Sequence, residues 1–195
     1  MGAANEITLY LVQTVLSLFL IAVLLRFLLQ LVRADFYNPI SQFLVKVTNP
    51  VLIPLRKIIP GLGGLDFAAI VLALLVQLIA IAAAIMLAGY KLPAVGMMLV
   101  WAALSLVGVL VNIYFFALLA MIILSWVAPG GNNPVLFLLH QITEPVMAPF
   151  RKMLPAMGGI DFSPILLFIL INIIQIALRH MAQSVNLPTQ FVFGI

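Results

Sequence analysis

Two aspartates occupy equivalent positions in this chain, and paired aspartates can do acid–base chemistry. Asp66 and Asp161 lie 95 residues apart, and each stands just before a long apolar run. Two carboxylates at a membrane edge can share one proton, as in an aspartyl protease. An aspartate that follows a Gly-Gly turn and opens a helix has a simpler use, because it accepts hydrogen bonds from the free N–H groups of the first turn. We therefore interpret both as helix caps and expect no catalytic residue.

Polar residues inside the apolar runs are a second candidate site. Ser17 corresponds to Asn112, and Gln77 corresponds to Asn172, at the same 95-residue offset. Such residues either hydrogen-bond between helices, at about 0.6 kcal/mol per contact, or line a polar pathway. No acid stands beside these amides to hold a cation, so hydrogen bonding between helices is the interpretation that we favour.

Arg26 is a third candidate, about two helical turns before the end of the first apolar run. An arginine in this position usually extends its charged end to the lipid headgroups. The alternative is a pair with Asp35, Asp66 or Glu144, which would clamp the two halves of the chain together. The residue at the 95-residue offset is Met121, so this feature is not duplicated.

Two basic pairs, Arg56-Lys57 and Arg151-Lys152, are the strongest surface feature. A basic residue near a membrane surface attracts anionic lipid headgroups by about 1 kcal/mol. We therefore predict that these pairs contact headgroups and help to orient the protein. Docking to an acidic partner or to a phosphate is the alternative.

The candidate residues belong to a duplicated segment. Residues 38–67 and 133–162 align without a gap. Self-similarity at a fixed offset indicates a repeated structural unit, and we divide the chain into repeats 1–95 and 96–195. The identical pairs are Pro39/Pro134, Thr48/Thr143, Pro50/Pro145, Pro54/Pro149, Arg56/Arg151, Lys57/Lys152, Pro60/Pro155, Gly63/Gly158, Gly64/Gly159 and Asp66/Asp161.

The composition requires a membrane around these repeats. Of the 195 residues, 66% are hydrophobic and 7% are charged, whereas a soluble domain carries about 25% charged residues. The net charge of +4 is small and scattered, which favours contacts with anionic headgroups and excludes a nucleic-acid partner. Cysteine is absent, so no thiolate site exists. His140 and His180 are expected on opposite sides of the membrane, and we expect no metal, haem or other cofactor.

Four apolar runs are long enough to cross a bilayer, for which about 20 residues suffice. They cover residues 7–32, 67–88, 104–127 and 163–187. The stretch from Ala94 to Val127 is too long for one upright span, so residues 93–103 either lie in the interface or lengthen a tilted third helix. Trp101 is expected at headgroup level. The predicted fold class is all-α transmembrane, with four transmembrane helices.

An amphipathic helix is expected between the two spans of each repeat, over residues 39–58 and 134–153. The apolar stripe of the first consists of Ile40, Phe43, Leu44 and Val47. The polar residues opposite that stripe are Ser41, Gln42, Lys46 and Thr48. The second stripe consists of Val135, Leu138, Leu139 and Ile142. Pro50, Pro54 and Pro60 are expected to break regular helix, and Gly63-Gly64 to form a sharp turn.

Basic residues predict the orientation. We call residues 33–66 and 128–162 the first and second connectors; they hold six of the basic residues, and Lys91 and Arg179 fall on the opposite side. The positive-inside rule predicts cytoplasmic connectors and outside termini. With two spans each, the repeats should run parallel. Small residues at Ala80 to Ala84 and at Gly108 favour close helix packing, and we expect a homo-oligomer.

A long motif in the second repeat resembles the signature of a known family. It reads Thr143-Glu144-Pro145, Pro149-x-Arg151-Lys152, Pro155 and Gly158-Gly159-x-Asp161-Phe162-Ser163-Pro164. It is similar to the signature of YggT, a family of bacterial integral membrane proteins whose cyanobacterial and chloroplast relatives are called YlmG. The first repeat has Asn49 in place of the glutamate and Ala68-Ala69 in place of Ser-Pro, so any specific role of Glu144 belongs to the second repeat alone.

The resemblance implies a non-enzymatic protein of the bacterial inner membrane. Proteins of this kind are linked to tolerance of osmotic shock and to potassium balance, which implies an influence on ion passage. Relatives are linked to cytochrome assembly, cell division and nucleoid placement, which implies the alternative, a scaffold whose cytoplasmic connectors recruit a membrane-protein partner. The residues agree with the absence of catalysis, since they include no nucleophile–base pair, metal cluster or phosphate loop.

Overall fold

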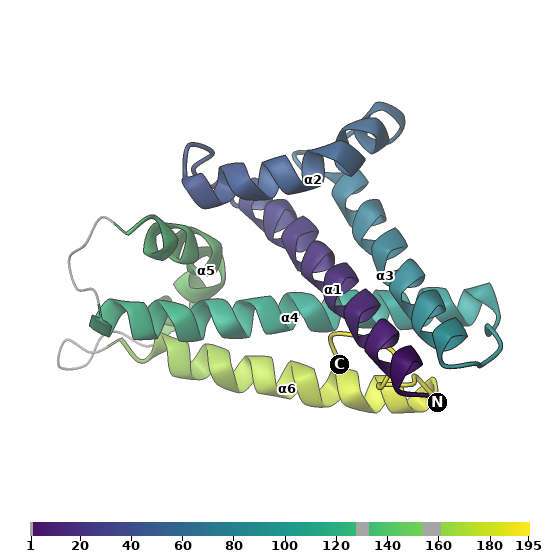
Figure 1. Ribbon diagram of the computed structural model, residues 1–195. Helices are drawn as coiled ribbons and strands as arrows, with labels where there is room; N and C mark the ends of the chain where they lie inside the picture. The colour runs from purple at the N-terminus through teal and green to yellow at the C-terminus, as the bar shows by residue number, and fades with distance from the viewer. Residues whose placement is uncertain (1, 128–132, 154–160) are drawn as a thin grey trace.

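Helices are the only regular elements in the residues that the computed structural model describes, which are 2–127, 133–153 and 161–195. In chain order they are α1 (Ala3–Leu31), α2 (Pro39–Ile58), α3 (Phe67–Leu87), α4 (Val95–Val127), α5 (Pro134–Met153) and α6 (Ser163–Ser184) (Figure 1). Four of them, α1, α3, α4 and α6, are long and apolar enough to cross a membrane. The predicted all-α transmembrane fold is confirmed.

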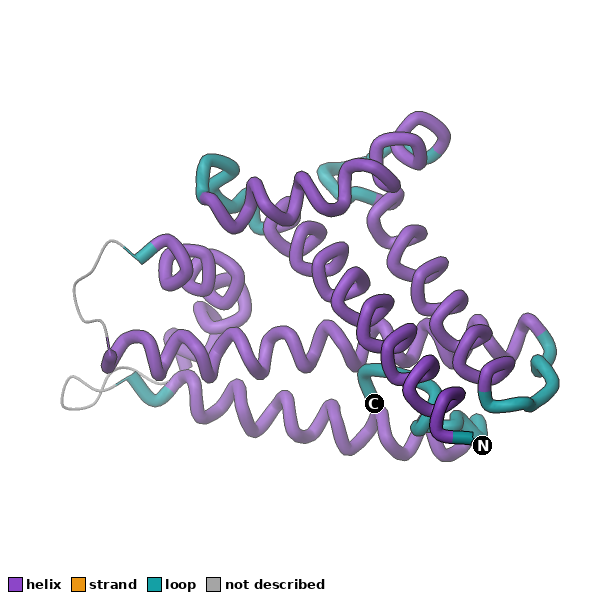
Figure 2. The backbone as a smooth tube through the Cα atoms, in the orientation of Figure 1, coloured by secondary structure: helices purple, strands orange, loops and turns teal. Residues whose placement is uncertain are grey.

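The two short amphipathic helices lie at the same end of the four long ones. In Figures 1 and 2, α1 and α4 run in the same general direction toward that end, and α3 and α6 return from it. Two hydrogen bonds join the connectors there: Asn38 Nδ2 donates to Pro134 O over 2.7 Å, and the Asp35 N–H donates to Gln141 Oε1 over 3.1 Å. The repeats therefore run parallel, with their connectors side by side.

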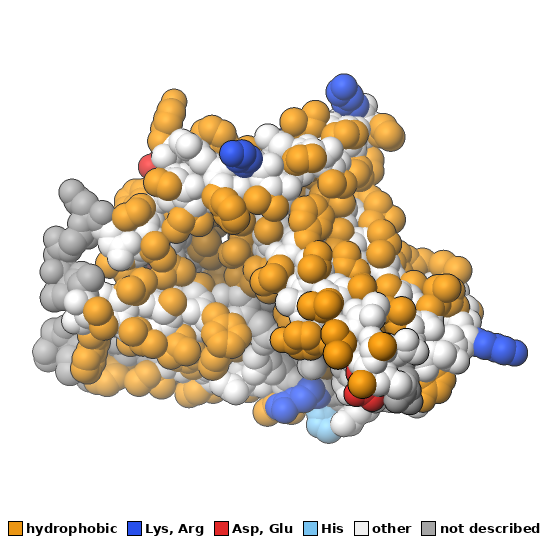
Figure 3. Space-filling model, viewed as in Figure 1, with side chains coloured by type: hydrophobic (Ala, Val, Ile, Leu, Met, Phe, Trp, Pro, Cys, Tyr) orange, Lys and Arg blue, Asp and Glu red, His pale blue; other side chains and the backbone are white. Residues whose placement is uncertain are grey.

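Three buried clusters hold the helices together. The first joins α1, α2 and α3 through residues such as Leu24, Leu52 and Leu72, and it extends to Val109 of α4 and Leu138 of α5. The second joins α4, α5 and α6 through Leu118, Met147 and Leu167. A third cluster joins the far ends of α3, α4 and α6 to residues 185–195, which we call the tail. The outer surface between the two ends is largely hydrophobic, as Figure 3 shows, which suits a lipid environment.

The helix ends differ from the predicted spans by a few residues. The run predicted at 7–32 is observed as Ala3–Leu31, the run at 67–88 as Phe67–Leu87, and the run at 163–187 as Ser163–Ser184. α6 ends early because Asn186 has a positive φ of 49° and the Leu187 N–H bonds back to Ala182 O over 2.9 Å. This closing turn is a Schellman motif, which an apolar run alone does not reveal.

The third span is one continuous helix. α4 starts at Val95 and not at the predicted residue 104, so residues 95–103 lengthen the helix and do not form a separate interfacial segment. At 1.5 Å per residue α4 is about 50 Å long, well beyond the roughly 30 Å of hydrocarbon, which favours a tilt. Trp101 was predicted at the headgroups, but it is buried against the tail, and its Nε1 donates to Val185 O over 3.0 Å.

The prediction that prolines break the connector helices is wrong. α2 continues through Pro50 and Pro54, and α5 continues through Pro145 and Pro149. Each proline removes one backbone hydrogen bond. All four prolines are exposed, so they lie on the outer face of each helix, while the opposite face packs on the spans. Pro60 follows the end of α2, and Gly63-Gly64, with φ of 62° and 84°, form the turn into α3.

The buried face of α2 also differs from the predicted apolar stripe. Ser41 and Thr48, predicted on the polar face, are buried beside Leu44. Phe43 and Val47 point outward and are 62% and 37% exposed. In α5 the buried face likewise includes Thr143 together with Leu138 and Ile142. A helix at a membrane surface can direct apolar side chains to lipid as well as to protein, which is why the stripe alone misassigned the packed face.

Candidate functional site

The second connector holds its arginine between two acids. The Arg151 Nε donates to Asp161 Oδ2 over 2.9 Å, and its Nη1 donates to Glu144 Oε2 over 2.6 Å. The hydrogen bond to Asp161, followed by the one to Glu144, raises the pKa of the Arg151 guanidinium. All three side chains are more than a third exposed, so each pair contributes at most about 1 kcal/mol to stability.

Asp161 also supports the start of α6. Its Oδ1 accepts a hydrogen bond from the Ser163 N–H over 2.9 Å, although the N-cap residue itself is Phe162. Partial burial acts to raise the pKa of the Asp161 carboxyl, but the hydrogen bonds from Ser163 and Arg151 outweigh it, so that pKa lies below its ordinary value. Pro155, Gly158 and Gly159, the repeat partners of Pro60, Gly63 and Gly64, lie outside the described residues.

The first connector holds its arginine between one acid and one amide. The Arg56 Nε donates to Asp66 Oδ2 over 3.2 Å, and its Nη2 donates to Gln30 Oε1 over 2.9 Å. Asp66 is the N-cap of α3, and its Oδ1 accepts from the Ala69 N–H over 3.3 Å. The Asp66 side chain is 3% exposed, against 41% for Asp161. The two aspartates therefore have the same task in different surroundings.

The lysines of the basic pairs are on the outside of the connectors. Lys57 and Lys152 are both exposed, and neither forms an ion pair within the described part of the chain. Figure 3 shows Lys and Arg side chains over α2, above the hydrophobic band. Within each basic pair, the arginine thus binds protein groups and the lysine remains available to a headgroup or a partner.

Arg26 clamps α1 to α2 and contacts none of the acids proposed from the sequence. It is 7% exposed. Its Nη1 lies 2.5 Å from Thr48 Oγ1, 2.8 Å from Asn49 Oδ1 and 3.3 Å from Val45 O. The alternative, a pair with Asp35, Asp66 or Glu144, is not observed, because Nη1 donates to neutral groups of α2.

The equivalent position in the second repeat is apolar. Met121 is buried, and Thr143 lies with its hydroxyl 3.4 Å from the Met121 sulfur. Thr48 accepts a hydrogen bond from Arg26 in the first repeat, whereas its equivalent, Thr143, contacts the Met121 thioether in the second. Asn49 and Glu144 differ in the same way: Asn49 turns toward the span, and Glu144 turns toward Arg151.

Gln77 lies at the centre of a polar cluster that holds the tail. It is 1% exposed. Its Nε2 donates to Ser105 Oγ over 2.5 Å and lies 3.4 Å from Phe193 O, to which the Ser105 hydroxyl donates. Its Oε1 is buried without a hydrogen-bond partner within the described residues. This amide therefore binds backbone of the tail and is not aligned along an open path.

The other intramembrane amides separate into two groups. Asn112 accepts from Gln175 Nε2 over 2.9 Å and lies 3.4 Å from Gly194 O. Asn172 is exposed and donates to Phe168 O of its own helix over 2.8 Å, and Ser17 similarly donates to Thr14 O over 3.0 Å. Gln77 and Asn172 are thus equivalent in sequence but not in environment.

Close backbone contact explains the small residue in the middle of α4. A Cβ on Gly108 would meet the carbonyl oxygen of Gly194 at 2.1 Å. Gly194 has a positive φ of 110°, and a Cβ there would meet Val109 Cγ2 at 2.4 Å. The glycine that the sequence assigns to close packing therefore accommodates the tail of the same chain.

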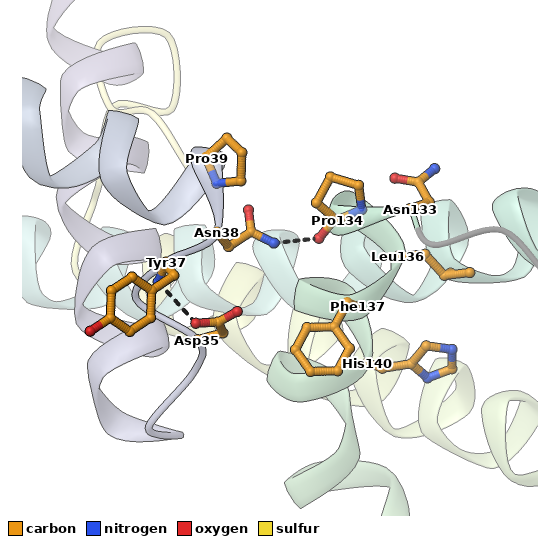
Figure 4. Close-up of a pocket in the computed structure, with 9 residues that line it drawn as sticks. All are labelled: Asp35, Tyr37, Asn38, Pro39, Asn133, Pro134, Leu136, Phe137 and His140. Carbon is orange, nitrogen blue, oxygen red and sulfur yellow. Dashed lines mark hydrogen bonds between the residues drawn. The ribbon is translucent and has the colours of Figure 1, made fainter.

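A hollow of about 460 Å³ separates the starts of the two connectors (Figure 4). Asn38 and Pro134 are joined by a hydrogen bond across it, Phe137 and His140 lie on α5, and Asp35 lies on the opposite side. The Asp35 carboxylate accepts from the Tyr37 N–H over 2.9 Å. One acid, Asp35, and one histidine, His140, line this hollow.

Sequence reasoning missed three polar residues that the packing brings into use. Ser105 and Gln175 help to hold the tail, and Gln30 accepts from Arg56. Ser105 and Gln175 lie within apolar runs, and their repeat positions are Tyr10 and Ala80, so duplication gave no signal for them. Within the described residues, no group of three acids or histidines is arranged to hold a metal.

Comparison with known proteins agrees with the internal symmetry. The model of the CCB3/YggT family matches residues 5–87 and again residues 100–182, which keeps the 95-residue offset of the repeat. Protein PA0392 of Pseudomonas aeruginosa is 48% identical over 188 residues, covering 95% of each chain. YggT of Escherichia coli K12 is 38% identical over 180 residues, covering 92% of this chain and 93% of that one.

More distant similarity extends to a plastid protein. YlmG homolog protein 2 of Arabidopsis thaliana, a chloroplast protein, is 34% identical over 61 residues, which is 31% of this chain and 24% of that protein. No solved structure matches. The two tandem matches, the long relatives and the four apolar helices together show that this chain is a membrane protein of the CCB3/YggT family.

Proposed function

We propose that this protein is a non-enzymatic scaffold of the bacterial inner membrane that serves envelope and osmotic homeostasis. The observation that carries the proposal is the pairing of the two connectors through Asn38–Pro134 and Asp35–Gln141. Pairing brings the start of α2 next to α5, so the two connectors present their exposed residues at the same end of the bundle. A surface gathered at one end of a membrane bundle suits recruitment of a partner better than two separate loops would.

The chemistry of this surface suits a membrane-associated partner. Lys57 and Lys152 are exposed and basic. Phe43, Ile58 and Phe137 are 62%, 81% and 53% exposed. Exposed apolar side chains beside basic ones bind lipid headgroups and the flanks of other membrane proteins. A second copy of this chain is one such partner, and we include a homo-oligomer in the proposal.

The recruitment test uses cross-linking in native membranes. A photoreactive residue in place of Phe43, in the full chain, should give a discrete cross-linked protein product. That product should decrease strongly in the Lys57→Gln, Lys152→Gln double variant and remain in Lys91→Gln, whose lysine lies at the other end. A product of twice the chain's mass would identify the homo-oligomer. Cross-links to lipid alone would contradict the scaffold.

The sidedness of the proposal is separately testable, because the chain contains no cysteine. Excess basic charge supports cytoplasmic connectors and outside termini. Single cysteines in place of Lys57 and Lys152 should resist a membrane-impermeant maleimide in intact cells, and a cysteine in place of Asn5 should react. Labelling of Lys57→Cys but not of Lys152→Cys in intact cells would contradict a shared cytoplasmic side.

Ion passage is the second candidate, and one observation favours it. Ser17, Asn112 and Gln190 share a cavity of about 530 Å³ beside the tail. Because the Gln77 and Ser105 side chains bind Phe193 O, a route through this region requires the tail to move. Purified protein in liposomes should then pass potassium, and the Ser17→Leu, Asn112→Leu double variant should not. Flux equal in the double variant would remove these residues as pathway groups, and absence of flux would leave the scaffold.

A further inference from the structure

We propose that the first connector contains a binding site for a phosphate group, formed by Arg26, Arg33 and Arg56. The three arginines line one cavity of about 370 Å³ between the end of α1 and α2. That volume falls within the roughly 300–1,000 Å³ of small-molecule sites. The proposal goes beyond the scaffold, since it assigns a ligand to a cavity within one repeat.

The charge of the cavity is unbalanced. None of the residues that line it is acidic. Asp66 is the one carboxylate, among the described residues, that pairs with an arginine of the cavity, and it binds Arg56. The end of α1 adds only about half a negative charge. Three positive guanidinium groups therefore face one negative carboxylate and about half a negative charge from the helix end. The remaining positive charge is what a bound anion would neutralise.

Arg26 has donors left for such an anion. A guanidinium carries five N–H donors in a planar fork. In the part of the chain that the structure describes, the protein acceptors Val45, Thr48 and Asn49 all lie at Nη1. Nε and Nη2 have no protein acceptor there, although the residue is 7% exposed. A buried guanidinium with two free nitrogens at a cavity wall is a strong phosphate ligand, because it can donate in a bidentate manner.

The position of the cavity agrees with phosphate chemistry. Arg33 follows Val32, the C-cap of α1, at the end of a membrane span where lipid phosphates lie. Basic pockets between helices at the cytoplasmic edge bind anionic headgroups. The apolar side chains of Leu29 and Phe36 form part of the wall and could contact the glycerol of a lipid. A lipid headgroup and free phosphate share the same recognition, and experiment separates them.

The second repeat provides an internal contrast. Met121 and Ala128 replace Arg26 and Arg33, and Arg151 is bound by both Glu144 and Asp161. Two acids around one arginine leave an excess of negative charge. The proposed site therefore belongs to the first repeat alone, and one site per chain is the expected stoichiometry.

The test is an equilibrium titration of the full chain in a neutral detergent at about 0.15 M salt, where long-range attraction is screened. The probes are short-chain phosphatidylglycerol, short-chain phosphatidylcholine and inorganic phosphate. Phosphatidylglycerol should bind one to one, and phosphatidylcholine more weakly because of its cation. The exposed residue Arg33 gives the main variant: Arg33→Gln should weaken binding about tenfold. Lys57→Gln, which removes the same charge outside the cavity, should change it less than about twofold.

Each outcome decides the proposal. Binding of phosphatidylglycerol alone supports a lipid headgroup, and equal binding of inorganic phosphate with the same Arg33 dependence supports the free ion. Arg26→Met, which copies the second repeat, should abolish binding in either case, and Arg33→Gln remains decisive if that variant does not fold. Absence of saturable binding by both anions, unchanged affinity in Arg33→Gln, or an equal loss in Lys57→Gln would overturn the site.

Discussion

The two connectors share one backbone plan but balance their charges differently. In both, a continuous helix that contains two internal prolines brings an arginine to the aspartate that precedes the next span. In the first connector, buried Arg26 of the span also donates to the neutral side chains of Thr48 and Asn49. The second replaces that arginine by methionine and the asparagine by Glu144. One duplicated scaffold thus carries a cationic pocket and an acidic cluster.

This difference shows that the two connectors share the residues that support their backbone and differ in the residues that could bind a ligand. Two of the residues kept in both copies, Arg56 and Asp66, form the ion pair and support the start of the next span. The residues that differ, Arg26 and Asn49, line or face the interior of the connector. Positions that break the repeat are therefore where a specific function of one copy is to be sought.

The largest expected effect comes from making the first connector resemble the second. Arg26→Met removes a charged donor from Thr48, Asn49 and Val45. A hydrogen bond to a charged group contributes about 1.5–3 kcal/mol to stability. The three bonds share one nitrogen, so their contributions do not add in full. We expect the unfolding free energy to fall by about 3 kcal/mol, measured by denaturation in mixed micelles.

Met121→Leu is the matched change in the second repeat. It conserves volume and should cost less than about 1.5 kcal/mol. Equal losses in the two variants would contradict the view that the first connector depends on a polar clamp and the second does not.

The tail offers the next comparison, because it follows the helices of the second repeat, packs against α3, α4 and α6, and has no equivalent after the helices of the first repeat. Residues 90–100, its counterpart by offset, form the link to α4 and its first turns. Gly108→Ala would drive a Cβ into the Gly194 carbonyl. We expect a loss of about 2 kcal/mol, and increased labelling of a cysteine in place of Gln190 as the tail leaves its cleft.

Gly96→Ala is the control on the same helix, since no atom lies within 4 Å of a Cβ there. It should be neutral or stabilise by up to about 1 kcal/mol, because alanine is the better helix former. Similar labelling of the tail cysteine in both glycine variants would show that the close contact is not what holds the tail.

Much of the architecture was predictable, and its limits have a physical cause. Run length and helical period are local signals, so the four spans and the two connector helices followed from the residues. The packed face of α2 could not be predicted, because lipid and protein interior are equally apolar. An apolar side chain can face lipid, as Phe43 does, or protein, as Leu44 does. Arg26 was recognised, but its partners depend on how α2 folds over α1.

The packing of the tail, and the side chains that contact it, could not be predicted from the sequence. Gln77 and Asn112 were identified as intramembrane polar residues, yet nothing local connects them to Phe193 and Gly194. Ser105 and Gln175 were missed because the duplication does not repeat them, since Tyr10 and Ala80 stand at the equivalent positions. Contacts between segments about 80 to 120 residues apart arise from packing alone.

Acidification should remove a smaller contribution to stability, which comes from Asp161 in the second connector. Because the folded pKa of Asp161 is lowered, its contribution is complete above the unfolded value of about 3.9 and is lost as pH falls through the folded pKa. Both partners are exposed, so Asp161→Asn should cost up to about 1 kcal/mol at pH 7. The difference from wild type should persist down to about pH 4 and vanish below it. A difference that grew on acidification would have the wrong sign.

The smallest expected effect concerns the repeat-related amides. Gln77→Leu removes the hydrogen bond to Ser105 and should cost about 0.6 kcal/mol, the average for such contacts in membranes. The loss is limited because Gln77 Oε1 has no partner to lose and Ser105 still binds Phe193 O. Asn172→Leu should change stability by less than about 0.3 kcal/mol, since that amide is exposed and bonds to its own helix. Equal costs in mixed-micelle unfolding would mean that the two amides act alike, and the inequivalence of the repeats would then stop at the connectors.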